Sequence, residues 1–240
     1  MVWIKICGIT NKSDAEMAVR CGADALGFVF STDSPRRIDL EAAGGIISYI
    51  RDIAGRGGTG TVGPGWNRMK EAEIAGVFVN EDPEKIRNFI QKLKLDYVQL
   101  SGDEDADYIK RLKGMAAIKI IKTIRVSDSD GSHPDRTERT IRGFEGLTDH
   151  ILMDSYHPVK YGGTGKTFDA DTARQFGALP GFILSGGLDH LNIAEAIKSI
   201  GPFGIDASSR LESSPGRKDH RLIKSFIEAA RSAEETDTGS

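Results

Sequence analysis

The sequence has little cysteine, little net charge and no long apolar run, and each shortage argues against a class of protein. Its 240 residues include two cysteines, Cys7 and Cys21, which are too few for a disulfide framework. Neither belongs to a CxxC pair or to a cysteine–histidine cluster with zinc spacing, so we expect no metal site. The formal net charge of −3 gives no global basic field, which argues against nucleic acid or an anionic membrane as the main partner.

Targeting signals are also missing from the sequence. The N-terminus has no charged stretch followed by an apolar run and a cleavage site. No apolar segment approaches the roughly 20 residues that are needed to span a bilayer. We therefore expect a soluble, cytoplasmic protein, either a monomer or a homodimer, that binds neither membrane nor nucleic acid. A small anionic substrate is compatible with this composition, because a local site can be positive on a mildly acidic protein.

What is present is a regular alternation of short apolar runs and longer amphipathic ones. The apolar runs are VWIKI, DALGFVF, EIAGVFVN, DYVQL, AIKIIKTI, HILMDS, GFILSG and FGIDASS. Most are apolar throughout, which is typical of parallel strands that are buried on both faces. Eight such units in about 230 residues predict an α/β fold, a (β/α)8 TIM barrel with eight parallel strands. An open doubly wound sheet is the alternative, but it would usually show a GxGxxG motif after the first strand.

The domain organisation follows from the same pattern. We expect a single barrel domain over residues 1–233 and a polar tail over 234–240. Two segments depart from the alternation. Residues 55–70 are glycine-rich without apolar periodicity, and residues 127–143 begin as a polar loop and end as a helix. The first follows a helix and precedes a strand, so in a barrel it belongs on the N-terminal face, away from the chemistry.

In a barrel, the carboxyl ends of the strands carry the catalytic groups. The ends predicted here are unusually polar, and a random set would be more apolar. They comprise Cys7, the SPRR sequence after Phe30, Asn80, Gln99, Arg125, Asp154, Ser185 and Asp206. Cys7 itself can be an inert core residue, a nucleophile or a base, whereas Cys21, at the end of the first helix, is interpreted as a packing residue.

The loops after the seventh and eighth strands point to a phosphate site. ILSGGLDH and IDASSRLE are small-residue turns at the two places where barrels hold a phosphate. Gly186 and Gly187 let backbone amides approach an anion, and Ser208 or Ser209 can add a hydroxyl group. Two ordinary tight turns are the alternative interpretation, but it does not explain why both occur at the expected positions.

Two further segments have features of binding loops. Arg36 follows the second strand, and a guanidinium group can hold a carboxylate or a phosphate through two parallel hydrogen bonds. A solvated surface charge is the alternative for this arginine. The glycines of YGGTGKTFD, at residues 161–169, lack the spacing of a P-loop but suit a mobile lid that excludes water.

Taken together, these motifs resemble the phosphoribosylanthranilate isomerase family, the barrel enzymes of the tryptophan pathway. The resemblance runs in order from about residue 2 to residue 228. Its most specific feature is the presence of both KICG and GGTGKTFD in one sequence. The other matching segments are GADALGFVF with SPR, GVFVNEDPE, VQLSGDE, MDS, ILSGGL and SSPGRKD.

The resemblance implies an aldose–ketose isomerase that performs an Amadori rearrangement. N-(5-phosphoribosyl)anthranilate would become 1-(2-carboxyphenylamino)-1-deoxyribulose 5-phosphate. The family's general base corresponds to Cys7 and its general acid to Asp154. Arg36 is then expected at the anthranilate carboxylate, with Asp206 lining the site. We expect no metal or organic cofactor, because the iminium intermediate is itself the electron sink.

The chain departs from the family pattern at two positions, and two other functions compete. Ser101 stands where the family usually has histidine, and Arg210 stands where a glycine is usual. Arg210 could clash with the phosphate loop or add a positive charge for the anion. The alternatives are the related histidine-pathway isomerase, which would have an aspartate in place of Cys7, and a non-catalytic barrel that binds phosphosugars.

The position of the glycine-rich segment generates a first prediction. Replacing residues 56–69 by a brief turn should leave kcat and KM for phosphoribosylanthranilate nearly unchanged, because a loop from a helix to a strand lies on the face opposite the chemistry. Steady-state kinetics of the folded deletion variant checks this. A large loss of activity would mean that the segment reaches the site or an essential interface.

Overall fold

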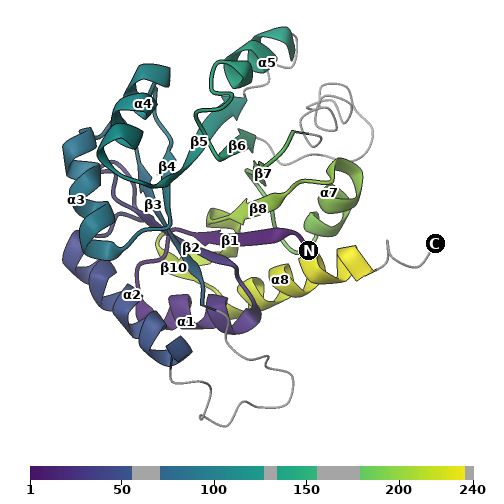
Figure 1. Cartoon of the computed structure of the whole chain (residues 1–240). Helices are drawn as coiled ribbons and strands as arrows, with labels where there is room; N and C mark the ends of the chain where they lie inside the picture. The colour runs from purple at the N-terminus through teal and green to yellow at the C-terminus, as the bar shows by residue number, and fades with distance from the viewer. Residues whose placement is uncertain (56–70, 127–133, 156–178, 236–240) are drawn as a thin grey trace.

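Eight parallel strands close into a barrel in the computed structural model, which describes residues 1–55, 71–126, 134–155 and 179–235 (Figure 1). Each strand pairs with the next along the chain, and the last pairs with the first. The strands are β1 (Trp3–Cys7), β2 (Ala25–Val29), β3 (Glu73–Phe78), β4 (Tyr97–Leu100), β5 (Lys119–Val126), β6 (His150–Ser155), β7 (Phe182–Ser185) and β8 (Gly204–Ala207).

Helices surround this barrel (Figure 1). Within the described residues they are α1 (Lys12–Cys21), α2 (Leu40–Gly55), α3 (Pro83–Leu93), α4 (Ala106–Met115), α5 (Pro134–Arg142), α7 (Ile193–Ile200) and α8 (His220–Glu235). None of the helices described is long and apolar enough to cross a membrane. The closed barrel confirms the predicted fold class, and the open doubly wound sheet was the wrong alternative.

Local sequence signals explain where the helices begin and end. Asn11 caps α1, because its side chain accepts a hydrogen bond from the backbone N–H of Asp14 at 2.9 Å. The helix ends at Gly22, whose φ of 101° lies in the left-handed region that glycine enters readily. Asp82 caps α3 in the same way, and Pro83 occupies its first turn.

The core has two layers that follow the alternation of side chains along each strand. One layer fills the barrel interior and consists of Trp3, Ala25, Ala75, Tyr97, Ile121, Leu152 and Ile183. Above it lies a small cluster of Cys7, Val29 and Val77. The outward-facing residues form a larger core between the strands and the helices. The carboxyl ends of the strands therefore lie on top of a packed interior, as in other TIM barrels.

The structure adds one element that the sequence analysis did not predict. Two short antiparallel strands, β9 (Glu212–Ser214) and β10 (Arg217–Lys218), form a hairpin between β8 and α8. Helix α8 also extends to Glu235, so Glu234 and Glu235 lie in the helix rather than in the expected tail. The helical end of segment 127–143 corresponds to α5. Residues 56–70 and the predicted lid at 161–169 lie outside the described residues.

Candidate active site

The register of the barrel places several polar residues at one level. Lys5 on β1 is in register with Asp206 on β8, and Asp206 is in register with Ser185 on β7. Ser185 in turn aligns with Asp154 on β6. Because residues in register on parallel strands point to the same side of the sheet, these side chains gather at the barrel mouth.

A cavity of about 260 Å³ opens at this level. The structure brings every site residue expected from the sequence to its wall, namely Cys7, Arg36, Gln99, Asp154, Gly186, Gly187, Asp206, Ser208 and Ser209. The wall also includes Ser101, Thr123, Arg125, Ser185 and Arg210. This cavity is our candidate active site, because it collects the groups at the carboxyl ends of the strands.

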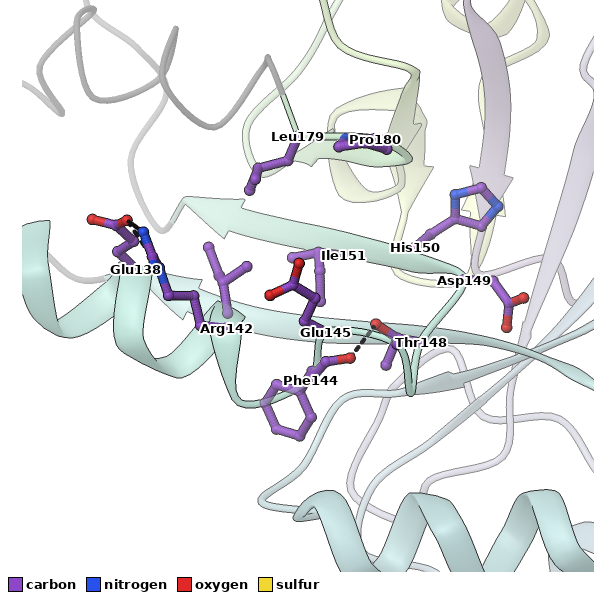
Figure 2. A pocket seen from close by; sticks show the side chains of 12 residues that line it. Glu138, Arg142, Phe144, Glu145, Thr148, Asp149, His150, Ile151, Leu179 and Pro180 are labelled. Atoms are coloured by element: carbon purple, nitrogen blue, oxygen red, sulfur yellow. Dashed lines mark hydrogen bonds and ion pairs between the residues drawn. The ribbon is translucent and has the colours of Figure 1, made fainter.

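A larger cavity, of about 710 Å³, lies elsewhere (Figure 2). It is bounded by α5, the turn that follows it, the start of β6 and Leu179–Pro180 (Figure 2). Its charged pair, Arg142 and Glu138, is an exposed bridge within one helix. None of the residues that line the strand-end cavity lies here. Its size alone therefore does not make it the functional site.

Lys5 and Asp206 form an ion pair beneath the cavity. The Lys5 Nζ atom donates to Asp206 Oδ1 at 2.7 Å, and the lysine side chain is completely buried. Burial disfavours the charge on Lys5, but the neighbouring Asp206 and Cys7 together raise its pKa. Buried charges in proteins are stable when they are paired in this way. Lys5 therefore remains a cation inside the barrel.

Cys7 ends β1 directly above this pair. Burial raises the pKa of the Cys7 thiol, and the negative charge of Asp206 adds to that effect, while Lys5 and Lys218 oppose it. Positive charge close to a thiol ordinarily favours its thiolate form. The charges are present, but burial outweighs them, so the resting group is a thiol.

Asp154 faces the same cavity from β6. Burial raises the pKa of its carboxyl group, and the negative charge of Asp206 raises it further, whereas Arg125 and Lys5 act in the opposite direction. A carboxyl group that keeps its proton more readily than usual is suited to the work of a general acid.

An amide and two hydroxyl groups form a network on β4 and β5. Gln99 Nε2 donates to Ser101 Oγ at 3.1 Å and to Thr123 Oγ1 at 3.3 Å, and the two hydroxyl groups lie 3.0 Å apart. The Gln99 Oε1 atom is buried and has no partner among the described residues. Ser101, where the resemblance led us to expect a histidine, thus joins a network that still offers an acceptor to a ligand.

The loops after β7 and β8 have the backbone shape of an anion site. Gly186 and Gly187 both have positive φ, at 95° and 63°, which few other residues adopt. Asn192 fixes this turn by donating from Nδ2 to the Gly187 carbonyl at 3.0 Å. On the neighbouring loop, Ser208 Oγ donates to the Cys7 carbonyl at 3.1 Å. The phosphate loop expected from the sequence therefore adjoins the strand end that carries Cys7.

Arg36 is fixed by a carboxylate of the β9–β10 hairpin. Its Nε and Nη2 atoms donate to the two oxygens of Glu212 at 2.7 and 2.8 Å. Glu212 also accepts from Lys218 Nζ at 3.0 Å. Burial opposes ionisation of Glu212, but the hydrogen bond from Arg36 and the charge of Lys218 keep the pKa of Glu212 below its usual range. One edge of the Arg36 guanidinium is therefore occupied, and within the described part of the chain the end that carries Nη1 is left for a ligand.

Comparison with known proteins assigns the family. A family model described as N-(5'-phosphoribosyl)anthranilate isomerase matches residues 65–229. The N-(5'-phosphoribosyl)anthranilate isomerase of Geobacter sulfurreducens is 37% identical over 231 residues, which cover 96% of this chain and 99% of the relative. The chain belongs to the N-(5'-phosphoribosyl)anthranilate isomerase family.

Solved structures of phosphoribosylanthranilate isomerases agree with this assignment. The Thermotoga maritima enzyme superimposes with a TM-score of 0.77 at 36% identity, covering 97% of this chain and 100% of its own. A second isomerase structure, with a TM-score of 0.75 at 33% identity and the same coverage, holds reduced 1-(o-carboxyphenylamino)-1-deoxyribulose 5-phosphate. The family resemblance inferred from the sequence motifs is thereby confirmed.

Three charged residues that contact residues of this cavity were missed by the sequence analysis. Lys5 was counted as part of an apolar strand, although a lysine within such a run is itself a signal of a buried partner. Glu212 and Lys218 lie on the unpredicted hairpin. The SSPGRKD motif contains Lys218 and served only as a family match, but its charges could have indicated a contribution to the site.

The environment of Asp154 generates the second prediction. Asp206→Asn should lower the pKa of the Asp154 carboxyl group, because it removes a nearby negative charge, and Arg125→Met should raise it by removing a positive one. Titration of the carboxyl carbon by NMR checks both directions. The exposed Arg37 does not line the cavity, so Arg37→Met is the control. Shifts of the same sign in both test variants would contradict this electrostatic account.

Proposed function

We propose that the strand-end cavity isomerises N-(5-phosphoribosyl)anthranilate to 1-(2-carboxyphenylamino)-1-deoxyribulose 5-phosphate, with Asp154 as the general acid and Cys7 as the general base. The observation that carries this assignment is that a thiol and a carboxyl group with a raised pKa line one small cavity. An acid and a base on separate strands can act on two atoms of one bound substrate.

Proton transfer accounts for the whole reaction. Asp154 gives its proton to the ring oxygen of the ribose, the bond from that oxygen to C1 breaks, and the nitrogen lone pair forms an iminium ion. The positive iminium acidifies the hydrogen on C2, which the Cys7 thiolate removes. The electron pair of that C–H bond forms the C1=C2 double bond, while the C=N π pair returns to the nitrogen and gives an enolamine. Transfer of the hydroxyl proton from the oxygen on C2 to C1 leaves a ketone at C2. Cys7 acts as a base and forms no covalent bond to the substrate.

Two anion sites hold the ends of the substrate. The turns at Gly186–Gly187 and Ser208–Ser209 suit the phosphate, and the exposed Arg210 beside them adds positive charge on the same wall. Arg36 suits the anthranilate carboxylate through the end of its guanidinium group that Glu212 leaves open. Gln99 and Asp206 line the space between these two sites.

The proposal also includes the location, the oligomeric state and the domain organisation expected from the sequence. The protein acts on a small molecule in the cytoplasm, as a monomer or a homodimer, and residues 1–233 form one domain. No described group of histidine, cysteine and acidic residues could hold a metal ion, and the chemistry above runs on side-chain protons alone. The histidine-pathway isomerase is disfavoured as an alternative because a cysteine ends β1, where that family would have an aspartate.

The acid–base pair generates the third prediction. Cys7→Ser and Asp154→Asn should each lower kcat by about 10²–10⁴-fold, the usual range for one acid–base group. The measurement is turnover of saturating phosphoribosylanthranilate, generated in the cuvette because it is labile. Circular dichroism controls for the fold, and Cys21→Ser, which lies outside the cavity, is the matched control for loss of a thiol. Near-normal turnover in either active-site variant would remove that residue from the mechanism.

Arg36 generates the fourth prediction. Arg36→Met should weaken binding of a product analogue by roughly 2–5 kcal/mol, the range for a desolvated charge pair, and Arg36→Lys should weaken it less. Lysine keeps the charge but cannot share two edges between Glu212 and a ligand. Calorimetry with analogues that have or lack the carboxylate measures this.

The neighbouring arginine supplies the control for that experiment. Arg37→Met should bind both analogues normally, because Arg37 is exposed and does not line the cavity. Inorganic phosphate should bind Arg36→Met as it binds the parent protein. If removal of the carboxylate weakens binding equally in the parent and in Arg36→Met, Arg36 does not contact that group.

A further inference from the structure

The position of Lys5 is not explained by the assignment of an acid and a base. Lys5 and Cys7 are two residues apart on β1, so their side chains point to the same side of the strand, into the barrel. The carboxylate of Asp206 balances the positive charge of Lys5, but that pairing alone does not require the lysine to lie beside the thiol of Cys7. Lys5 and Cys7 therefore influence each other: the lysine lowers the pKa of the thiol, and the sulfur raises the pKa of the lysine.

A glycine on the neighbouring strand provides the space for this arrangement. Gly27 on β2 is in register with Cys7. A Cβ atom at Gly27 would lie 2.7 Å from Cys7 Sγ and 3.1 Å from Lys5 Cε. Contacts below 3.0 Å do not occur at real Cβ atoms, so any other residue would displace the thiol. The sulfur and the end of the lysine side chain thus flank the same empty position.

The other cations near the thiol each have a hydrogen-bond partner other than the sulfur. Arg36 and Lys218 both pair with Glu212. Arg125 donates to the carbonyl of Ser101. Asp154 and Asp206 line the same cavity, and the negative charge of Asp206 disfavours a second negative charge on the sulfur. Among the cations of the described residues, Lys5 is the one whose side chain shares a strand, a face and the Gly27 space with Cys7.

We propose that Lys5 is a positioning residue that stabilises the Cys7 thiolate during the reaction, sharing its charge between Asp206 and the sulfur, and that Gly27 keeps the space in which it does so. This inference rests on the proposed function of Cys7. Catalysis needs a deprotonated sulfur and a protonated Asp154 at the same time. When Cys7 and Asp154 share one proton, the state with the proton on Asp154 is the less populated of the two. A fixed buried cation beside the sulfur increases the population of that arrangement.

A thiol titration tests the proposal without using the isomerase reaction. Thiolate absorbance at 240 nm is followed against pH in a Cys21→Ser background, because the pKa of Cys21 is itself raised to about 11 and would overlap. The informative comparison is Asp206→Asn against the double variant Lys5→Met with Asp206→Asn. These two proteins differ only at Lys5, and neither leaves a buried aspartate without its counter-ion.

We expect the Cys7 transition in the double variant to move to higher pH, by about one pH unit or more, because the stabilising cation is gone. The value of kcat should fall about tenfold or more, with KM largely retained. Identical thiol titrations in the two proteins would overturn the proposal and leave Lys5 as a structural partner of Asp206.

Glycine substitutions give a second, independent comparison. Gly27→Ala should displace the sulfur and change the thiol titration together with kcat. Gly76→Ala on β3 is the matched control, because its Cβ would meet Leu95 and Phe78 at 2.8 and 2.9 Å, in the core between barrel and helices. It should lower stability and leave the titration unchanged. Equal titrations in both glycine variants would refute the role of Gly27.

The outcomes also distinguish a failure of the proposed function from a failure of the coupling between Lys5 and Cys7. If Lys5 shifts the thiol titration but the parent protein does not turn over phosphoribosylanthranilate, the proposed function fails and the Lys5–Cys7 coupling stands. If the parent turns over and the titration does not depend on Lys5, the coupling fails and the proposed function stands.

Discussion

The buried ion pair between Lys5 and Asp206 joins the first strand of the barrel to the last. It lies at the seam where β1 pairs with β8, directly below the cavity. Removing one partner from such a pair typically costs about 3–5 kcal/mol, because the other charge remains buried and unpaired. The same pair places a positive and a negative charge under Cys7 and beside Asp154. The same two residues therefore join the first strand to the last and set the electrostatics of the site.

The site works against the ordinary tendencies of its two titratable groups. Burial raises the pKa of both Cys7 and Asp154. This suits the proposed role of Asp154 as an acid that holds a proton at neutral pH, and it opposes the proposed role of Cys7 as a base that must lose one. Nearby positive charge offsets the effect at the thiol only in part. Because one carboxylate, Asp206, acts on both groups, a change at that position alters the pKa of Cys7 and that of Asp154 together.

Much of the site could be predicted from the sequence because the barrel converts position along a strand into position in space. Once eight parallel strands were predicted, their ends had to meet at one face, and Cys7, Asp154 and Asp206 followed. Glu212 and Lys218 could not be found this way, since they lie on strands of three and two residues. Such short strands have no apolar pattern.

The sequence also could not predict the protonation state of Cys7. Positive charge near Cys7 could be anticipated, but whether it outweighs burial depends on depth, which the sequence does not encode. In the same way, the pattern placed Arg36 at the site without showing that Glu212 occupies one edge of its guanidinium group. Both results depend on contacts between residues far apart in the chain.

The hairpin of β9 and β10 has a consequence for how the protein is made. It ties the end of the chain to its beginning, since the backbone N–H of Lys218 donates to Asp14, 204 residues away. Asp206, Glu212 and Lys218 are synthesised long after Lys5, Cys7 and Arg36, yet they pair with Lys5 and Arg36 or lie beside Cys7. A nascent chain therefore presents Cys7 without these charged neighbours until residues 206–218 have been synthesised.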